Sequence, residues 1–332
     1  MRAKKRNKNG LKIFVSILAI LVIGILGYIY SIYANVKDSM DTAYTPVEIE
    51  TFRTTNTGTV ADSSEDEERR ADAGAMTPSE LLEAGEPVSI LLLGVDTGDL
   101  GRTEQGRSDS MVVVTINPHT QKTTLLSIPR DTYTEIVGYG TSDKINHAYA
   151  FGGTAMSINT VQQMLDIPID FYVMVNMAGI QEIVDAVGGI TVESPLAFNQ
   201  NGYDFVQGTN QLDGEAALAF ARMRYEDPAG DTGRQGRQRL VIEAVIRKLA
   251  TPETLLNYQT ILQSLSSNVQ TSFQLSDFYT LQSQDYLGAV DNMNQQQLGG
   301  TGGMMNEIYY NFVDGTELTR VQDLLQAELE LE

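Results

Sequence analysis

The hydrophobic pattern divides the chain into an apolar segment near its start, a polar stretch and a long region of alternating strand and helix patterns. Residues 13–33 are almost wholly apolar, and about twenty such residues suffice to cross a bilayer core. Residues 38–87 are poor in apolar side chains and include DSSEDEERRADAG, which cannot bury enough surface to offset its ordering entropy. We therefore expect a membrane anchor, a mobile spacer and then a folded domain.

Two short elements are predicted within the spacer, a strand at 47–53 and a helix at 79–84. The folded domain is expected to begin near Val88, because VSILLLGVD at 88–96 is a continuous apolar run typical of a strand buried on both faces. The segment MVVVTINPHTQKTTLLSIPRD then predicts two strands rich in β-branched residues. A turn at 117–121 joins them, with Pro118 fixing the bend.

Further along, strand and helix patterns alternate, which predicts a layered α/β domain. Glycine pairs at 152–153 and 188–189 and a glycine-rich segment at 299–303 are interpreted as turns. Residues 251–332 are predicted to be mixed, with helical pieces. The predicted elements in between are helix 155–165, strand 171–175, helix 178–186, strand 190–193, helix 212–220 and a longer helix that begins within 221–240.

The charge pattern gives the apolar segment an orientation. Residues 2–12 hold six cations and no acid, so the N-terminus is predicted to be cytoplasmic and everything after Tyr33 extracellular. A cleavable signal peptide is the alternative, but its apolar core is usually shorter, and Ile32-Tyr33-Ala34 lacks a small-residue cleavage pattern. A bacterial surface protein is therefore the favoured class.

The charge of the exported part disfavours nucleic acid as a partner. With six of the 23 cations before the span, 17 cations remain against all 43 acids, a formal net charge of −26. DNA binding normally requires a basic surface that releases counterions. The chain has no cysteine, so disulfides cannot stabilise the domain.

Five arginines are concentrated in ARMRYEDPAGDTGRQGRQRL, residues 221–240. A helix is predicted here, capped by Asp231 or Thr232. At 100° per residue, Arg234 and Gln238 share the face that points toward the domain, whereas Arg239 falls on the opposite, solvated face.

An arginine that points inward must be paired. Arg234 could be structural, bonded to a nearby Asp. Arg222 and Arg224 add further donors from a short span in which acids are few, which favours an oxyanion ligand. The planar guanidinium fork binds phosphate oxygens in pairs.

A second group of polar residues lies at the ends of predicted strands. Asp96 closes the first strand, Arg107 and Asp109 open the second, and Arg130 follows the third. Strand ends of an α/β sheet are the usual place for a ligand crevice. Two carboxylates there could share Mg²⁺, which takes its remaining ligands from water and phosphate, although Asp at a strand end is by itself common. Together, these acids and arginines describe a pyrophosphate site.

Other candidate sites are weaker. Lys144, Asn146 and His147 in DKINHAY are interpreted as a hydrogen-bonded structural cluster, and His119 as a solvated turn residue. GVDTG at 94–98 is not accompanied by a nucleophile elbow or a second Asp-Thr-Gly, which argues against a serine or aspartic hydrolase.

Seven motifs in a fixed order resemble the LytR-CpsA-Psr family over residues 88–250: LLLGVD, GRSDS, SIPRDTY, DKINHAYAFGG, IPIDFYV, VDAVGGI and RMRYEDPAGDTGRQGRQR. The resemblance implies an α/β/α layered domain with a central mixed sheet and an apolar tunnel for a lipid, preceded by a single transmembrane helix. The predicted organisation is a basic cytoplasmic tail at 1–12, the anchor at 13–33, an extracellular spacer at 34–86 and the catalytic domain at 87–332.

The resemblance also implies an enzyme that transfers a teichoic acid, capsular or rhamnose polysaccharide. Its donor is a polyprenyl pyrophosphate carrier, and its acceptor is a peptidoglycan hydroxyl outside a Gram-positive cell. Asp96 and Asp109 would hold Mg²⁺. The residues implied to bind the pyrophosphate are Arg107, Arg130, Arg222, Arg224, Arg234 and Gln238.

Two alternatives stay open at this point. The chain could be a noncatalytic lipid-pyrophosphate-binding or regulatory membrane protein of the transcription attenuator type. Hydrolysis of the pyrophosphate could also be the main reaction or a side activity.

Overall fold

The computed structural model describes residues 43–47, 76–96, 105–251, 268–283 and 286–331. The predicted tail and anchor at 1–33 lie outside these ranges, as does the predicted strand at 47–53 apart from its first residue. None of the helices within the ranges combines the length and the apolar character that a membrane crossing requires.

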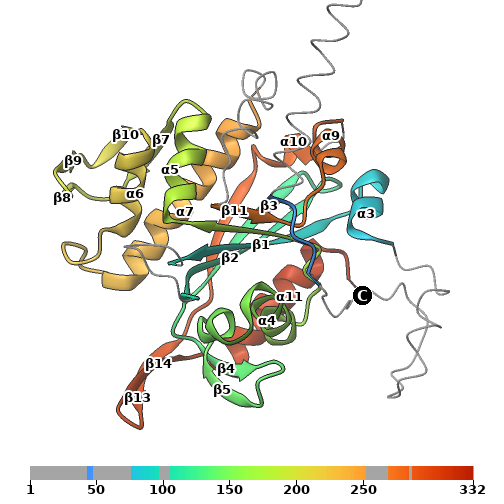
Figure 1. The fold of residues 1–332 in the computed structure, drawn as a ribbon, viewed down its shortest axis with the longest axis horizontal. Coiled ribbons are helices and arrows are strands. Elements are labelled where there is room, and N and C mark those ends of the chain that lie inside the picture. Colours follow the sequence, from blue (N-terminus) through green and yellow to red (C-terminus); the bar gives the residue numbers. More distant parts are fainter. Residues whose placement is uncertain (1–42, 48–75, 97–104, 252–267, 284–285, 332) are drawn as a thin grey trace, which may run out of the picture.

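A mixed β-sheet forms the centre of the described fold (Figure 1). Strand β1 pairs in antiparallel fashion with β2 and in parallel with β6. The prediction of an α/β domain with a central mixed sheet is thereby confirmed. Across the sheet the strands are β11 (Val269–Thr271), β6 (Phe171–Asn176), β1 (Val88–Val95), β2 (Ser108–Asn117), β3 (Lys122–Ile128) and β12 (Met293–Gln297).

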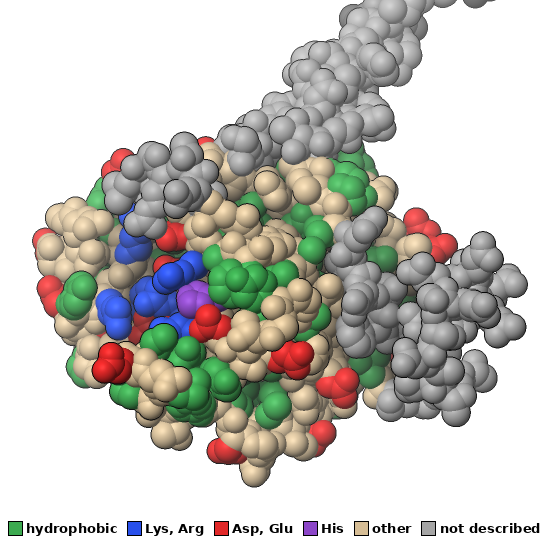
Figure 2. Space-filling model, turned by 60° about the horizontal axis from the view of Figure 1, so that its bottom comes forward, with side chains coloured by type: hydrophobic (Ala, Val, Ile, Leu, Met, Phe, Trp, Pro, Cys, Tyr) green, Lys and Arg blue, Asp and Glu red, His purple; other side chains and the backbone are tan. Residues whose placement is uncertain are grey.

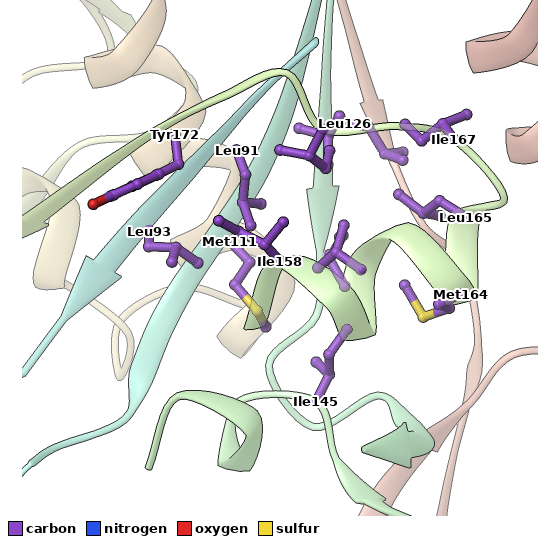
Figure 3. Packing of buried hydrophobic residues seen from close by; sticks show 14 of the residues in the cluster. Leu91, Leu93, Met111, Leu126, Ile145, Ile158, Met164, Leu165, Ile167 and Tyr172 are labelled. Atoms are coloured by element: carbon purple, nitrogen blue, oxygen red, sulfur yellow. The ribbon is translucent and has the colours of Figure 1, made fainter. Parts of the chain in front are cut away.

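Helices cover both faces of this sheet because its strands are apolar on both. Leu91 and Leu93 of β1 belong to one buried cluster and Ile90 to another. Figure 3 shows Leu91, Leu93 and Met111 near Ile158, which comes from a helix on the first face. That face is covered by α4 (His147–Leu165) and α11 (Gly315–Glu328), and the second by α3 (Pro78–Ala84), α7 (Gly230–Leu249), α9 (Leu275–Ser283) and α10 (Tyr286–Ala289).

A smaller layer packs on the outer side of α7 (Figure 1). Its core contains Phe198, Phe205 and Phe220, together with Val241 of α7. The other side of α7 contributes Ile242 and Ile246 to the cluster against the sheet. The layer consists of α5 (Met177–Ala186), α6 (Gly214–Arg222), β7 (Ile190–Ser194), β8 (Phe198–Gln200), β9 (Tyr203–Phe205) and β10 (Gly208–Leu212).

Because α7 is packed on two sides, the prediction of a solvated face around Arg239 is wrong. The Nε atom of Arg239 is buried without a hydrogen-bond partner, and Nη1 lies 3.5 Å from Oε1 of Gln297 in β12. Burial lowers the pKa of Arg239 below its usual value. The helical period predicts the direction of this side chain around the helix axis but not the element that covers it.

The predicted cap of α7 is also wrong. The helix begins after Ala229, which makes no side-chain cap bond. Asp231 lies inside the first turn, where its carboxylate accepts a hydrogen bond from Gln235 at 3.1 Å and lies 2.8 Å from Nη2 of Arg234. These partners replace the backbone amides that a capping Asp would bind.

Two hairpins project beyond α4 in Figure 1. The first pairs β4 (Tyr133–Ile136) with β5 (Thr141–Lys144), and the second pairs β13 (Thr301–Met305) with β14 (Ile308–Phe312). The prediction of a glycine-rich turn at 299–303 is therefore wrong for residues 301–303. Cross-strand pairing in β13 outweighs the low strand propensity of glycine.

Helix α4 begins eight residues before the predicted start at 155. The glycines at 152–153 do break the regular helix, since both have non-helical backbone angles inside α4. The other strands and helices predicted from 88 to 240 are present, and so is the predicted helix at 79–84, with bounds that differ by a few residues.

Arg237 ties α7 to the loop that joins it to α6. Its side chain is 1% exposed. Nε donates to the Phe220 carbonyl at 3.2 Å, and the other two nitrogens donate to the Met223 carbonyl and the Asp227 carboxylate. The guanidinium also lies 5.4 Å from the centre of the Phe198 ring. Every nitrogen of this buried cation thus has an acceptor, as a buried charge requires.

This anchor fixes the chain beside two of the predicted site residues. Arg222 and Arg224 flank Met223, whose carbonyl Arg237 holds. Asp227 accepts a further hydrogen bond from the Ala229 amide at 2.8 Å. The local sequence does not distinguish Arg237 from the neighbouring arginines, although Asp227 lies within the same stretch.

Replacing Arg237 by Met should reduce the free energy of unfolding by about 3–5 kcal/mol, because it leaves the Asp227 carboxylate buried without its cation. Urea denaturation measures the change. The control is Arg247→Met on the same helix, where the side chain is 42% exposed and pairs with Glu243, and about 1 kcal/mol or less is expected. Equal losses in the two variants would contradict the anchoring role.

The Asp227 pair also predicts a dependence of stability on pH. Burial alone would raise the pKa of Asp227, but the hydrogen bonds from Arg237 and the Ala229 amide and the charge of Arg237 lower it overall. Because its pKa is lower in the folded state, Asp227 stabilises the fold at pH values above its unfolded-state pKa of about 3.9. This stabilisation is lost as the pH falls through the folded-state pKa. Between pH 6 and pH 3, Asp227→Asn should therefore lose less unfolding free energy than the wild type. Equal losses of unfolding free energy in the variant and the wild type over this pH range would refute the role of Asp227.

Candidate functional site

Asp109 sits in a β-bulge at the end of the β1–β2 pair. Gly94 is opposite Ser110 and Val95 is opposite Ser108, so Asp109 is the extra residue of β2. A bulge redirects a side chain and often lies beside a functional site. Gly94 permits this close approach, because a Cβ atom there would lie 3.0 Å from Cβ of Ser110.

Beyond the bulge, Asp96 and Arg107 hold the two strand ends together. The Asp96 amide donates to the Arg107 carbonyl at 3.2 Å, and the Arg107 amide donates to Oδ1 of Asp96 at 2.6 Å. The carboxylates of Asp96 and Asp109 are thus carried by neighbouring, hydrogen-bonded ends of β1 and β2. Such ends form one edge of the sheet, where ligands of α/β proteins usually bind.

Arg130, just after β3, joins this edge to α7. Its Nη1 donates to Oδ1 of Asp109 at 2.8 Å, and its Nε lies 3.8 Å from Oδ2 of Asp131. Burial would lower the pKa of Arg130, but the charge and hydrogen bond of Asp109 and the charges of Asp231 and Asp131 raise it overall. Asp231 belongs to α7, so the start of this helix is close enough to the sheet edge for the two charges to interact.

Arg234 is a second, more deeply buried cation at this place. Its side chain is 13% exposed, and Nη2 lies 2.8 Å from Oδ1 of Asp231. Burial lowers the pKa of Arg234, and the positive charges of Arg130 and Arg224 lower it further, while Asp231 and Asp109 only partly compensate. Arg130, Arg224 and Arg234, with Asp109 and Asp231, form what we call the arginine cluster.

The arginine cluster contains buried donors without acceptors. Within the described part of the chain, Nε of Arg130 and both Nε and Nη2 of Arg234 have no hydrogen-bond partner. The contact of Nη2 with Asp231 is thus an ion pair whose angle does not give a hydrogen bond. Unsatisfied buried donors are destabilising, and a bound oxyanion would supply their acceptors. Figure 2 shows Lys and Arg side chains gathered on one face of the molecule, beside a histidine.

Arg224 is the most exposed arginine of the cluster, and the remaining predicted residues lie on the segments that border the cluster. Arg224 is 47% exposed with Nε 3.9 Å from Oδ1 of Asp231, and Arg222 is exposed at the end of α6. Gln238 is half-buried on α7, one turn beyond Arg234. Arg107 is exposed immediately before β2. Ion pairs thus join Asp109 to Arg130 and Asp231 to Arg224 and Arg234, and the other predicted residues lie on neighbouring backbone.

Two acids that matter here were missed as site residues by the sequence analysis. Asp231 was interpreted as a cap but lies next to the arginines, and its spacing of three residues from Arg234 is the signal that could have indicated this pair. Asp131 bridges two cations, with Oδ1 2.7 Å from Nζ of Lys144. Its only sequence signal was its position next to Arg130.

The two strand-end carboxylates suit a shared divalent cation. Asp109 gives Oδ1 to Arg130 and Asp96 gives Oδ1 to the Arg107 amide. Across the described residues, no group of three or more His, Cys, Asp or Glu side chains could hold a metal. Carboxylates with water and phosphate oxygens are the usual ligands of Mg²⁺, so this donor set fits a cation shared with a phosphate ligand.

Lys144 and His147 have structural partners, as the sequence analysis expected. Lys144 pairs with Asp131, and Nδ1 of His147 lies 2.7 Å from Oδ2 of Asp143. His119 is 47% exposed and lies 3.1 Å from Glu330. The neighbouring amide of Asn146 donates to the Arg130 carbonyl at 3.3 Å, so the start of α4 lies directly against the arginine cluster.

Comparisons with known proteins agree on one family. The sequence profile of the LytR_cpsA_psr family matches residues 49–327. The polyisoprenyl-teichoic acid–peptidoglycan teichoic acid transferase TagU of Enterococcus faecalis is 45% identical over 324 residues, covering 97% of this chain and 98% of that protein.

Two solved structures extend this likeness to the fold. A crystal structure described as a transcriptional regulator from Enterococcus faecalis is 44% identical, with a TM-score of 0.69, and the match covers 76% of this chain and 90% of that one. The crystal structure of TagU from B. subtilis is 42% identical, with a TM-score of 0.61, covering 74% of this chain and 98% of that one.

Inorganic pyrophosphate should bind the arginine cluster and raise the unfolding midpoint of the wild-type protein, because a ligand that binds only the folded state stabilises it. Arg234→Met should weaken this binding about tenfold or more, since it removes a charged donor. Calorimetric titration at low salt measures the affinity, which should fall as salt is added. Arg247→Met, at the exposed end of α7, serves as the control. Unchanged affinity in Arg234→Met would refute an anion site here.

Proposed function

This chain belongs to the LytR-CpsA-Psr family, and we propose that it transfers a teichoic acid from a polyprenyl pyrophosphate carrier to peptidoglycan. A capsular or rhamnose polysaccharide is the related choice of donor. The observation that carries the proposal is the set of buried arginine donors without acceptors beside two strand-end carboxylates. A pyrophosphate carries negative charge and oxygen atoms that can accept hydrogen bonds from these arginine donors.

In the proposed reaction, a peptidoglycan hydroxyl oxygen attacks the phosphorus that bears the glycan. A new P–O bond forms, the bond to the bridging oxygen breaks, and polyprenyl phosphate leaves with that oxygen. The hydroxyl proton is released to solvent or to a carboxylate of the site. Such reactions depend mainly on positioning and on neutralising developing charge, so no covalent intermediate on the protein is needed.

The roles of the arginines follow from their burial. Arg130 and Arg234 are fixed by Asp109 and Asp231, so they would hold the pyrophosphate oxygens with little reorganisation. Arg107, Arg222 and Arg224 are exposed, which suits contacts that form as the substrate enters. Gln238 would add a neutral donor one turn along α7. Arg237 contributes indirectly, by fixing the loop between α6 and α7.

Asp96 and Asp109 would hold Mg²⁺ in this proposal. When bound, Mg²⁺ supplies charge neutralisation on the phosphate oxygens. Asp109 would then be shared between the cation and Arg130, which already holds one of its oxygens. The ion pair with Arg130 orients the carboxylate.

The proposed location is the cell envelope, with the chain anchored once in the membrane of a Gram-positive cell through residues 13–33. The N-terminus would be cytoplasmic and the catalytic domain extracellular, near the lipid carrier. The apolar tunnel for the lipid is part of the same proposal. The formal charge of −26 after residue 33 disfavours nucleic acid as a partner.

The test is transfer of labelled glycan from a short-chain polyprenyl pyrophosphate donor to peptidoglycan oligomers, with and without Mg²⁺. A metal-dependent linked product is expected. Arg234→Met should lower kcat/KM by about 10²–10³, the usual effect of losing one preorganised donor for developing charge, and Arg247→Met should match the wild type. Tight donor binding without product would favour a binding or regulatory role, and release of free phosphorylated glycan alone would favour hydrolysis.

A further inference from the structure

Two aromatic rings, one from the β4–β5 hairpin and one from α4, stack on each other at the surface. Tyr139 is 52% exposed and Phe151 is 38% exposed. Their ring centroids are 4.0 Å apart and their planes differ by 13°. We call Tyr139 and Phe151 the aromatic pair. Exposed aromatic surface of this kind is unfavourable in water and often marks a binding site.

Both segments that carry the aromatic pair contain glycines with unusual backbone angles. Tyr139 lies at the tip of the β4–β5 hairpin, between Gly138 and Gly140, whose φ angles are 81° and 75°. These left-handed conformations are strained for residues with a side chain. Phe151 immediately precedes the non-helical glycines 152–153 inside α4. A hairpin tip and a helix break thus bring two rings together from separate elements.

A polar group borders the aromatic pair. His147 lies one turn before Phe151 on α4, and their ring centroids are 5.6 Å apart. Nδ1 of His147 is bound to Asp143, which also accepts a hydrogen bond from the Tyr310 hydroxyl at 3.2 Å. Asp143 therefore fixes the imidazole ring, leaving Nε2 as the nitrogen directed away from this contact.

The aromatic pair is linked to the arginine cluster by the start of α4. The Asn146 amide donates to the Arg130 carbonyl at 3.3 Å, and Asn146 directly precedes His147. Asn146 is 3% exposed, and its Oδ1 has no hydrogen-bond partner among the described residues. Gln105, two residues before Arg107, also contacts the start of α4, because its side chain donates a hydrogen bond to the Tyr149 carbonyl. Figure 2 shows a hydrophobic patch directly beside the histidine and the basic side chains.

We propose that the aromatic pair and His147 form a subsite for a hexopyranose ring of the wall glycan, a proposal that rests on the proposed function. One face of a pyranose carries only C–H bonds and packs on aromatic rings, while its hydroxyl and acetamido groups need polar partners at the edge. His147 supplies such a partner. A phosphate is a poor candidate, because the carboxylate of Asp143 lies beside this histidine.

The ring has two possible sources in the proposed reaction. It belongs either to the glycan strand of the acceptor or to the donor sugar next to the pyrophosphate. Both are pyranoses and both must lie close to the arginine cluster. Steady-state kinetics separate the two sources, because the substrate whose ring is held shows the change in KM.

The first measurement is binding without transfer. An uncharged N-acetylglucosamine oligosaccharide is titrated into the protein, and binding is followed by NMR. Tyr139→Ala and Phe151→Ala should each weaken binding about tenfold, the effect of losing one aromatic contact, whereas Tyr139→Phe should retain it. Tyr279→Ala is the matched control, since Tyr279 is 44% exposed on α9, which covers the opposite face of the sheet.

The second measurement compares KM and kcat for donor and acceptor in the same variants. A higher acceptor KM in Tyr139→Ala, with kcat little changed, assigns the ring to peptidoglycan, and a higher donor KM assigns it to the donor. Unchanged binding and unchanged KM in both aromatic variants would overturn the subsite. Oligosaccharide binding that depends on the aromatic pair, without transfer by any form of the protein, would support the subsite and refute the proposed function instead. Unfolding midpoints confirm that each variant is folded.

Discussion

Incomplete neutralisation of buried positive charge is the constraint on which the site depends. Asp109 pairs with Arg130, and Asp231 pairs with Arg234 and, at a longer distance, with Arg224. These ion pairs orient the side chains but leave buried nitrogens without acceptors. Asp131 also lies 3.8 Å from Nε of Arg130, yet two nitrogens of Arg234 stay without hydrogen bonds. Without these two acids, mutual repulsion and burial would drive the arginines toward solvent. The chain therefore keeps a positive site inside a strongly acidic domain.

Two arginines on one helix illustrate the difference between a structural and a ligand-binding cation. Arg237 has an acceptor for each nitrogen and is almost fully buried. Arg234, three residues earlier, has buried nitrogens without hydrogen bonds. The residue type, the helix and the local sequence are shared. What distinguishes them is whether the surrounding backbone supplies carbonyl acceptors, as Phe220 and Met223 do for Arg237.

Much of the fold could be predicted because local patterns determine it. The apolar run of β1, the Pro118 turn and the glycines that follow α5 act over a few residues, and the structure agrees with each. The aspartates and arginines at the strand ends were found in the same way. Tertiary features could not be found from local patterns. The bulge at Asp109 depends on the register between two strands, and the covered face at Arg239 depends on β12, some 58 residues away in sequence.

The position of α7 has a consequence for how the domain responds to a ligand. This helix belongs to two hydrophobic cores at once, through Val241 on one side and Ile242 on the other. Neither core can open without disturbing the helix that carries Arg234, so the outer layer and the central sheet should unfold as one cooperative unit. Free energy gained by binding an anion would then be shared by both cores. Substitutions among the phenylalanines of the outer layer would change ligand affinity without touching the ligand.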